Sequence, residues 1–336
     1  MGESSTDTPQ GVGRGEAGHV PVLLKEAIDF LAVRRGGTYI DATVGLGGHS
    51  FEIAKRLGAP GHLIGVDKDP KALEIAGKKL RPPAAGPSTA DFDSNESKPY
   101  ARDDRAAARD DEADWPTITL LNRSFASLAD DPQLAADGIL ADLGLSSLQL
   151  DDAARGFSFQ AEGPLDMRMD PQSERTAEQV VNHLDERQLA DVIYEFGEER
   201  RSRRIARAIV RSRPIRTTAQ LAGVISAAAR PMNSEERRIH PATRTFQALR
   251  IFVNRELDDL KALLDAAPRI LKRGGRIVVI SFHSLEDRIV KDAFREGATK
   301  DKYYRVLTKK PVVASEDEND RNPRARSAKL RAAERV

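Results

Sequence analysis

The sequence predicts an α/β fold: a parallel sheet flanked by helices and interrupted by an all-helical insertion. Short apolar runs alternate with helical patterns over the first 150 residues. One of these runs ends in an acid and a glycine-rich turn, and a helical pattern follows at once. Between about residues 155 and 250 only helical patterns remain. Alternating strands and helices are typical of a parallel sheet, and the purely helical stretch inside them indicates an insertion.

These patterns divide the chain into four parts. Residues 1–18 are polar and glycine-rich, which predicts a disordered N-terminal arm. Residues 19–154 form the first part of the sheet domain, and residues 251–336 form the second part with a basic C-terminal tail. The helical insertion spans 155–250. Within the first part, residues 81–116 are rich in Pro, Ser, Asp and Ala, so we expect a disordered surface insertion there.

Composition excludes several classes of protein. The chain has 336 residues, of which 40% are hydrophobic, and this is enough for a large core. It has no cysteine, which excludes disulfides, iron–sulfur clusters and a thiolate nucleophile. It has no apolar run long enough to span a membrane, no signal-peptide core and no cluster with metal-ligand spacing. We therefore expect a cytoplasmic protein without a metal or a membrane partner.

The glycine turn follows the first predicted strand. Residues 39–41 are the end of an apolar run, 45–48 read Gly-Leu-Gly-Gly, and 51–57 have a helical pattern. Glycine lets the backbone turn sharply and approach a ligand that a Cβ would block. The next strand ends in Asp67, where a carboxylate usually binds a ribose diol. The pair predicts a nucleoside-containing ligand, although a turn that only packs helix on strand remains an alternative.

Asp41 decides between the nucleoside ligands. Dinucleotide sites have the pattern G-x-G-x-x-G and place a pyrophosphate on the helix N-terminus. Here the pattern is G-x-G-G, and Asp41 precedes it by four residues. A carboxylate repels a pyrophosphate but attracts an ammonium group. S-adenosylmethionine carries an ammonium and a sulfonium and no phosphate, so it is the better match.

Two further strands are expected before the insertion. Residues 117–121 form one of them, and Phe125 in the following loop either packs on an adenine ring or belongs to the core. Residues 138–142 form the other, which ends in Asp142. Ligands of open parallel sheets bind outside the carboxyl ends of the strands. We therefore expect Asp41, Asp67 and Asp142 to line one crevice, with solvated turns as the alternative.

The insertion has helical patterns at residues 176–190, 190–196, 198–211 and 219–229. From Glu198 to Arg216 there are eight arginines and two glutamates. This density predicts a surface that contacts nucleic-acid phosphates, and a solvated helix face is the alternative. An insertion after the fourth strand would stand over the crevice, where a substrate is recognised.

The rest of the chain returns to the sheet. One helix is expected from about residue 238 to 264, then a turn at 272–275 and a strand at 276–280, with His283 just beyond it. A helix at 285–294 and a last strand at 303–307 follow. Residues 322–331 are basic and nearly free of large apolar side chains, which is equally compatible with an arm on RNA and with a solvated tail.

Several motifs resemble those of one known family, the bacterial small-subunit (16S) ribosomal RNA cytosine-N4 methyltransferases, also called the MraW family. The shared residues cover nearly the whole chain from His19 to Arg331. The motifs are His19-Val20-Pro21-Val22-Leu23, Asp41-Ala42-Thr43, Gly45-Leu46-Gly47-Gly48-His49, Asp142-Leu143-Gly144-Leu145-Ser146-Ser147, Gln149-Leu150-Asp151, Arg155-Gly156-Phe157-Ser158-Phe159, Pro164-Leu165-Asp166-Met167-Arg168-Met169, His240-Pro241-Ala242-Thr243-Arg244, Ser281-Phe282-His283-Ser284-Leu285-Glu286-Asp287-Arg288 and Asn322-Pro323-Arg324-Ala325-Arg326-Ser327.

The resemblance implies a Rossmann-like methyltransferase sheet, S-adenosylmethionine as donor and a cytidine of the ribosomal decoding region as acceptor. It implies small-subunit ribosomal RNA or the small subunit as partner and leaves a homodimer open. The stretch at residues 81–116 is longer than is usual in the family, so the position of Phe125 is the least secure. The implied cofactor contacts are Gly47, Gly48, His49, Asp67, Phe125, Asp142 and Gln149.

The chemistry of an exocyclic amine sets what the enzyme must supply. The nitrogen of cytosine N4 must leave conjugation and align with the methyl group, and its hydrogens need an acceptor. Asp142 either accepts them or binds the cofactor, and the resemblance favours the cofactor role. His283 is a second catalytic candidate, although a lone histidine is more often structural.

Three other functions compete with this one. An amino methyltransferase for another substrate would usually carry an Asn/Asp-Pro-Pro-aromatic motif, but Leu-Gly-Leu follows Asp142. A non-catalytic RNA-binding assembly factor would not need the intact glycine turn and strand-end acids. A dinucleotide oxidoreductase conflicts with the charge of Asp41.

Overall fold

The computed structural model describes residues 21–82, 114–229 and 240–336. The predicted N-terminal arm, residues 1–18, and most of the predicted insertion at 81–116 lie outside these ranges. So do His19 and Val20 of the first motif.

The described residues form one seven-stranded sheet with the order β3-β2-β1-β4-β5-β7-β6. The strands from β3 to β5 are parallel, whereas β7 pairs antiparallel with both β5 and β6. This is the predicted α/β architecture. The strands are β1 (Thr38–Asp41), β2 (His62–Asp67), β3 (Thr117–Asn122), β4 (Ala136–Asp142), β5 (Leu271–Ser281), β6 (Tyr304–Val306) and β7 (Lys329–Arg335).

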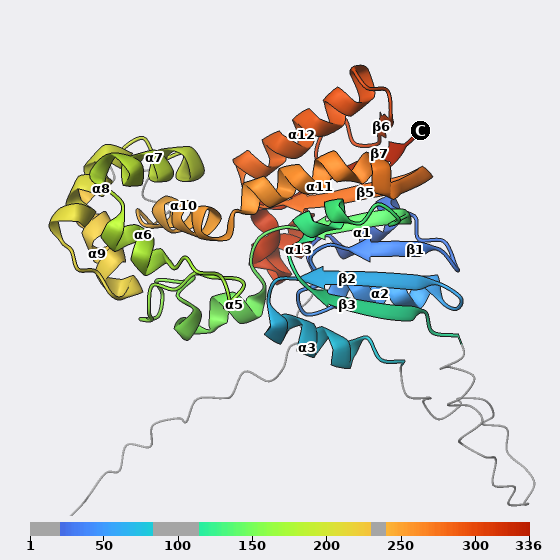
Figure 1. Cartoon of the computed structure of the whole chain (residues 1–336), viewed down its shortest axis with the longest axis horizontal. Helices are drawn as coiled ribbons and strands as arrows, with labels where there is room; N and C mark the ends of the chain where they lie inside the picture. The colour runs from blue at the N-terminus through green and yellow to red at the C-terminus, as the bar shows by residue number, and fades with distance from the viewer. Residues whose placement is uncertain (1–20, 83–113, 230–239) are drawn as a thin grey trace, which may run out of the picture.

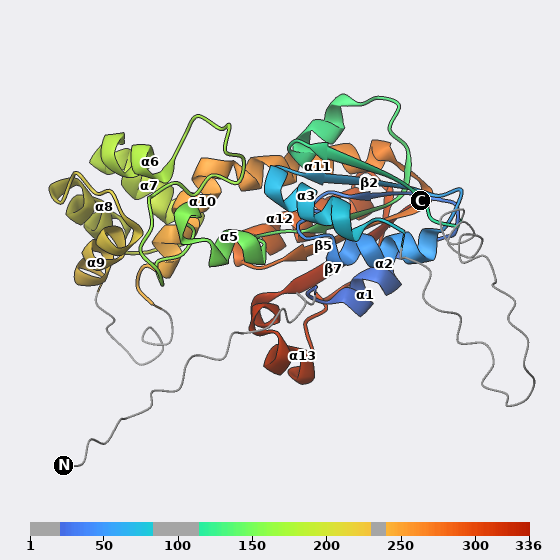
Figure 2. The same ribbon diagram turned by 90° about the horizontal axis from the view of Figure 1, so that it is seen from below.

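Helices cover both faces of the sheet. Successive residues of a strand point to opposite faces, so Tyr39 packs with α1 and α2 while Ile40 packs with α11 and α12. Figures 1 and 2 show these two layers with the sheet between them. The flanking elements are α1 (Leu24–Leu31), α2 (Gly48–Leu57), α3 (Pro70–Lys79), η1 (Phe125–Asp130), α11 (Glu256–Ile270) and α12 (Ser284–Thr299).

The strand order reverses at β1, which has β2 on one side and β4 on the other. Successive connections lead away from this point in opposite directions, so a crevice opens at the carboxyl ends of β1 and β4. In Figure 1 the arrowheads of β1 and β2 point toward the helical part of the molecule. The topology therefore places the helices of the insertion beside the ligand-binding edge of the sheet.

The helices between β4 and β5 have a core of their own, which extends from Phe157 to Val253. The prediction of one helix at 176–190 is wrong, because two helices cover this range. Asp185 is the N-cap of the second helix, and its side chain accepts a hydrogen bond from the N–H of Gln188. The helices are α5 (Ser147–Asp151), α6 (Ala177–His183), α7 (Glu186–Gly197), α8 (Ser202–Arg211), α9 (Thr218–Ala228) and α10 (Thr243–Asn254).

The predicted helix at 238–264 is also two helices. Arg255 is left-handed, with φ of 54°, and it ends α10 and begins α11. The predicted turn at 272–275 lies within β5, where Gly274 has φ of 78° and the register with β4 shifts. The glycines therefore form a bulge within β5 rather than a turn.

The C-terminal stretch is part of the folded sheet domain and not a solvated tail. Residues 329–335 form β7, which lies between β5 and β6 inside the sheet. Leu330 is fully buried, and the buried guanidinium of Arg331 donates to Asp287 over 2.6 Å. Before this strand come α13 (Glu316–Arg321) and the short helix η4 (Pro323–Ser327). In β7 the basic residues Lys329 and Arg331 alternate with the buried apolar residues Leu330 and Ala332. The basic residues alone had suggested a solvent-exposed stretch.

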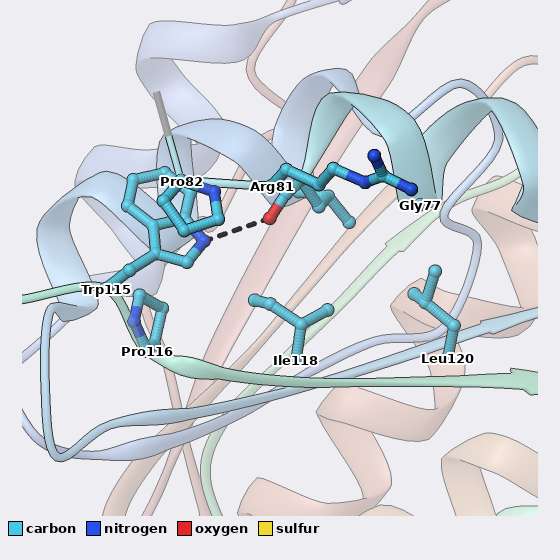
Figure 3. Close-up of a pocket in the computed structure, with 8 residues that line it drawn as sticks. Gly77, Arg81, Pro82, Trp115, Pro116, Ile118 and Leu120 are labelled. Atoms are coloured by element: carbon cyan, nitrogen blue, oxygen red, sulfur yellow. Dashed lines mark hydrogen bonds between the residues drawn. The ribbon is translucent and has the colours of Figure 1, made fainter. Parts of the chain in front are cut away.

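The predicted disordered insertion is too long at its C-terminal end. Trp115 packs against the ring of Phe51, with 5.8 Å between centroids, and its indole N–H donates to the carbonyl of Leu80 over 2.9 Å. Figure 3 shows Trp115 and Pro82 on one side of a hollow, with Ile118 and Leu120 of β3 below them. This tryptophan ties the start of β3 to the end of α3.

A substitution in β7 tests whether the C-terminus belongs to the core. Leu330→Ala should lower the free energy of unfolding by about 2–5 kcal/mol, because it removes a fully buried side chain. The control Arg326→Ala removes an exposed side chain of the same stretch and should change it by less than about 0.5 kcal/mol. Urea denaturation measures both. Equal effects would show that β7 does not contribute to the core.

Candidate active site

A cavity of about 330 Å³ lies at the carboxyl ends of the strands, between the sheet and the helical insertion. Six of the seven residues expected to bind the cofactor line it, and the seventh, Gly47, does not. The catalytic candidate His283 does not line it either. Its size falls in the range of small-molecule sites. The six are Gly48, His49, Asp67, Phe125, Asp142 and Gln149.

The glycine turn forms one wall. Gly45 and Gly47 have φ of 51° and 75°, in the left-handed region that favours glycine. A Cβ on Gly48 would lie 2.3 Å from the ring of Pro21, so only glycine lets the start of α2 pack there. Gly47 contributes through backbone geometry, since a Cβ on it would meet Ala76 of α3 at 3.2 Å.

Asp67 is held at the end of β2 by two backbone donors. The N–H of Gly45 donates to Oδ2 over 2.8 Å, and the N–H of Asp69 donates to Oδ1 over 2.9 Å. Burial nevertheless raises the pKa of Asp67 above its ordinary value. A fixed carboxylate that lines the cavity is what a ribose diol requires, as the sequence predicted for this position.

Asp41 corrects one expectation. The three strand-end acids do not all line the cavity: Asp67 and Asp142 do, but Asp41 lies behind the wall and is 1% exposed. Its carboxylate accepts from Ser50 Oγ over 2.6 Å and from the N–H of Thr43 over 3.1 Å. Asp41 therefore shapes the turn and adds negative charge without touching the cavity.

Asp142 presents an incompletely satisfied carboxylate. Its Oδ1 is buried without a hydrogen-bond partner among the described residues, and Oδ2 lies 3.6 Å from Nδ1 of His49. Burial, followed by the charges of Asp41 and Glu286, raises the pKa of Asp142 well above its ordinary value. Such a group is stabilised by a cation that enters the cavity.

Gln149 joins the cavity to the helical insertion. Its Oε1 accepts from the N–H of Ser146, and its Nε2 donates to Asp69 over 3.2 Å. Asp69 is fully buried and also accepts from Arg155 over 2.7 Å. Phe125 begins η1 and lines the cavity, where its ring can face a nucleoside base.

The cavity residues that escaped the sequence analysis include Arg250 in the last turn of α10, Glu256 at the start of α11 and Glu286 in α12. Arg250 and Glu256 resemble an ordinary exposed pair, and Glu286 resembles a helix-capping residue. The available signal was the place of Glu286 in the shared motif at residues 281–288 and the place of Arg250 and Glu256 near helix ends. His283, the second catalytic candidate, lies behind Glu286, with its Nε2 3.1 Å from Oε1 of that residue.

The C-terminal segment closes one side of the cavity. Arg324 and Ser327 line it, and Arg324 donates to the hydroxyl of Ser147 in α5. This basic stretch, for which an RNA arm and a solvated tail were equally expected, therefore forms part of the cavity wall.

Two negative findings apply to the described ranges. No group of His, Asp and Glu side chains there could hold a metal ion. None of the helices there has the length and apolarity that crossing a membrane demands.

Fold and cavity together define a nucleoside-binding α/β protein whose ligand carries positive charge. The cavity wall includes four acids, and two of them, Asp67 and Asp142, contact the glycine turn or the His49 that follows it. The four are Asp67, Asp142, Glu256 and Glu286. These residues fit S-adenosylmethionine, whose sulfonium and ammonium groups compensate buried carboxylates.

The chain belongs to the MraW methylase family, which matches residues 16–336. It is thus a methyltransferase of Rossmann-like fold that uses S-adenosylmethionine as methyl donor.

Relatives of high identity share almost the full length. A "Ribosomal RNA small subunit methyltransferase H" of Koribacter versatilis is 66% identical and covers 96% of this chain and 97% of its own. Proteins of the same name from Acidobacterium capsulatum and Solibacter usitatus are 58% and 47% identical, with 94% of this chain covered in each case and 98% and 99% of their own. A solved rRNA methylase of Streptococcus thermophilus is 10% identical over 95% of this chain and 99% of its own, with a TM-score of 0.39.

Asp41 should make stability depend on pH. Burial raises the pKa of Asp41 to about 6, so the folded protein binds its proton more tightly than the unfolded chain does. The contribution of Asp41 to stability is therefore present below about pH 4 and is lost as the pH rises to about 6, by about 3 kcal/mol at most.

The comparison of wild type with Asp41→Asn isolates this effect. The difference in unfolding free energy, measured with urea in the absence of ligand, should move in favour of Asp41→Asn between pH 4 and pH 6 and then stay constant. A difference that is independent of pH would mean that Asp41 is not a buried carboxyl of raised pKa.

Proposed function

We propose that the chain transfers a methyl group from S-adenosylmethionine to the exocyclic N4 of a cytidine in the decoding region of small-subunit ribosomal RNA. The observation that carries the proposal is the acid-lined cavity between the glycine turn and the helical insertion. The names of the relatives support the small-subunit RNA as substrate. The place of action is then the cytoplasm, with the RNA or the small subunit as partner.

The absence of cysteine supports an amine as acceptor. Methylation of pyrimidine carbon five usually needs a cysteine that adds to the ring, and this chain has none. An amino nitrogen has a lone pair and needs only alignment and a hydrogen-bond acceptor. Carboxylates in the cavity wall supply such acceptors.

The proposed cofactor contacts follow the cavity. Asp67 accepts hydrogen bonds from the ribose, Phe125 packs on the adenine, and Gly48 leaves room for the methionine part. His49, Asp142 and Gln149 complete the wall beside the reactive centre, and Gly47 keeps the turn in shape.

We assign substrate recognition to the helical insertion. Of the eight arginines between Glu198 and Arg216, Arg213 is turned inward onto the carbonyls of Val181 and Leu184. Others are exposed on α8, and three of these have no acidic partner in the described structure: Arg203, Arg204 and Arg211. Exposed guanidinium groups along one helix fit RNA phosphates.

The proposal is tested by mapping modified nucleosides. Small-subunit RNA from cells that lack this protein should lose one N4-methylated cytidine, and the purified chain with S-adenosylmethionine should restore it. Mass spectrometry of nuclease fragments locates the methyl group. A methyl group found only on another atom or another RNA would refute the proposed reaction, and no methyl transfer at all would favour an assembly factor.

The arginines of α8 make a separate prediction. Replacing Arg203, Arg204 and Arg211 by Gln should raise KM for the small-subunit substrate at least tenfold at physiological salt and reduce the salt dependence of binding by about 2 in the log–log slope. The affinity for S-adenosylmethionine should not change. Filter binding and titration calorimetry measure the two.

A matched control removes three exposed lysines from helices on the sheet, Lys55, Lys78 and Lys79. If this variant loses as much RNA affinity as the arginine variant, the effect is one of overall charge and α8 is not the contact surface.

A further inference from the structure

The cavity wall on the side of the helical insertion carries a compact group of buried charges. Arg250 donates from Nε and Nη2 to the two oxygens of Glu256, both over 2.8 Å. Glu286 lies close enough for its charge to act on Arg250. The three side chains are 16%, 9% and 3% exposed, and all of them line the cavity. Buried charges that face a cavity are costly unless a ligand uses them.

Glu286 is fixed in place from behind. Its Oε2 accepts from the N–H of Phe282 over 2.8 Å, and Nε2 of His283 lies 3.1 Å from its Oε1. Burial alone would raise the pKa of Glu286, but the adjacent imidazole of His283 and the charge of Arg250 outweigh it, so this pKa is lowered. The residue is therefore an oriented carboxylate anion beside Asp142, whose pKa moves in the opposite direction.

Hydrogen-bonding capacity remains on both sides of this group. Each carboxylate oxygen can accept two hydrogen bonds, and Oε1 of Glu286 has one close protein neighbour. Nη1 of Arg250 has no hydrogen-bond partner in the described part of the chain. One acceptor and one donor are thus left for a ligand.

This arrangement is complementary to the edge of cytosine. The edge presents a donor at N4 and acceptors at N3 and O2, so a carboxylate and a guanidinium match it. Uracil and guanine would instead place a carbonyl oxygen against the carboxylate, and such a contact is repulsive.

On the basis of the proposed function, we propose that Glu286 accepts a hydrogen bond from N4 of the target cytosine and takes its proton during transfer, while Arg250 donates to N3 or O2. His283 is then a positioning residue that acts through Glu286. Asp142 is left to face the donor, next to His49.

The step balances in atoms and charge. The N4 lone pair forms a bond to the methyl carbon as the carbon–sulfur bond breaks, and that electron pair stays on sulfur. N4 then carries a positive charge and an acidic proton, which passes to Glu286 and from there to water. A carboxylate of low basicity suffices, because N4 becomes strongly acidic only as the new bond forms.

The test compares Glu286→Gln with wild type in the full chain, in single-turnover methylation of small-subunit particles from cells that lack this protein. Glutamine preserves the helix cap but not the charge. At saturating S-adenosylmethionine the rate should fall at least 100-fold, whereas the affinity for S-adenosylmethionine should fall by less than the rate does. The control Glu296→Gln, on the exposed face of the same helix, should match wild type. A Glu286→Gln rate within threefold of wild type overturns the inference.

A second variant covers the case in which Glu286→Gln does not fold. His283→Asn keeps a good N-cap residue but removes the ring that contacts Glu286. The groups that face Glu286 are His283, Arg250 and Asp142, and loss of the imidazole beside Oε1 raises the pKa of Glu286. The rate of His283→Asn should therefore fall on the acid side at a higher pH than that of wild type. Coinciding pH profiles overturn the inference.

The product analysis separates the two proposals. If wild type places the methyl group on an atom other than N4 of cytidine, the proposed function fails, whatever the variants do. If the product is N4-methylcytidine and Glu286→Gln keeps its rate, only the role of Glu286 fails.

Discussion

The structure depends on burying several carboxylates at one edge of the sheet before any cation is bound. Asp41, Asp67, Asp142 and Glu286 are close enough for their charges to interact, and burial acts to raise the pKa of each. The fold offsets this cost with fixed donors: the N–H groups of Gly45 and Phe282, and the side chain of Ser50. A site built in this way binds a cationic ligand more tightly than a neutral one, because the ligand removes repulsion that the empty site retains.

The two walls of the cavity come from parts with separate cores, and buried polar contacts hold them in register. Asp69, the N-cap residue of α3, accepts a hydrogen bond from Arg155 of the insertion. Asn254 at the end of α10 binds the backbone of Met167 and Met169, and its carbonyl accepts from Lys68 over 2.7 Å. The Arg155–Asp69 and Lys68–Asn254 hydrogen bonds cross between the two parts. Donor and acceptor can therefore be aligned by the fold itself, which is where most of the advantage of an alignment-driven reaction lies.

Strands and helices with a clear apolar pattern could be predicted from the sequence. Contacts that depend on tertiary packing could not. Strands β1, β2 and β4 were recognised as apolar runs that end in acids, and this pattern placed Asp67 and Asp142 at the cavity. Asp41 has the same pattern yet points into the protein, since the last residue of a strand can face either way. Arg250, Glu256 and Glu286 lie on three helices, and only packing brings them together. In β7 the charge pattern indicated solvent, because the partner that neutralises Arg331 lies 44 residues away in α12.

The opposite pKa directions of Asp142 and Glu286 follow from what stands behind each. Glu286 has His283 and Arg250 nearby and remains ionised, whereas Asp142 has mainly other acids as charged neighbours. Asp142 therefore gains most from a positive charge, and its ionisation is coupled to the arrival of the donor. Glu286 needs no such help and is ready on the acceptor side from the start. In the proposed reaction, the cavity thus separates two carboxylates by environment, Asp142 toward the sulfonium and Glu286 toward the amine.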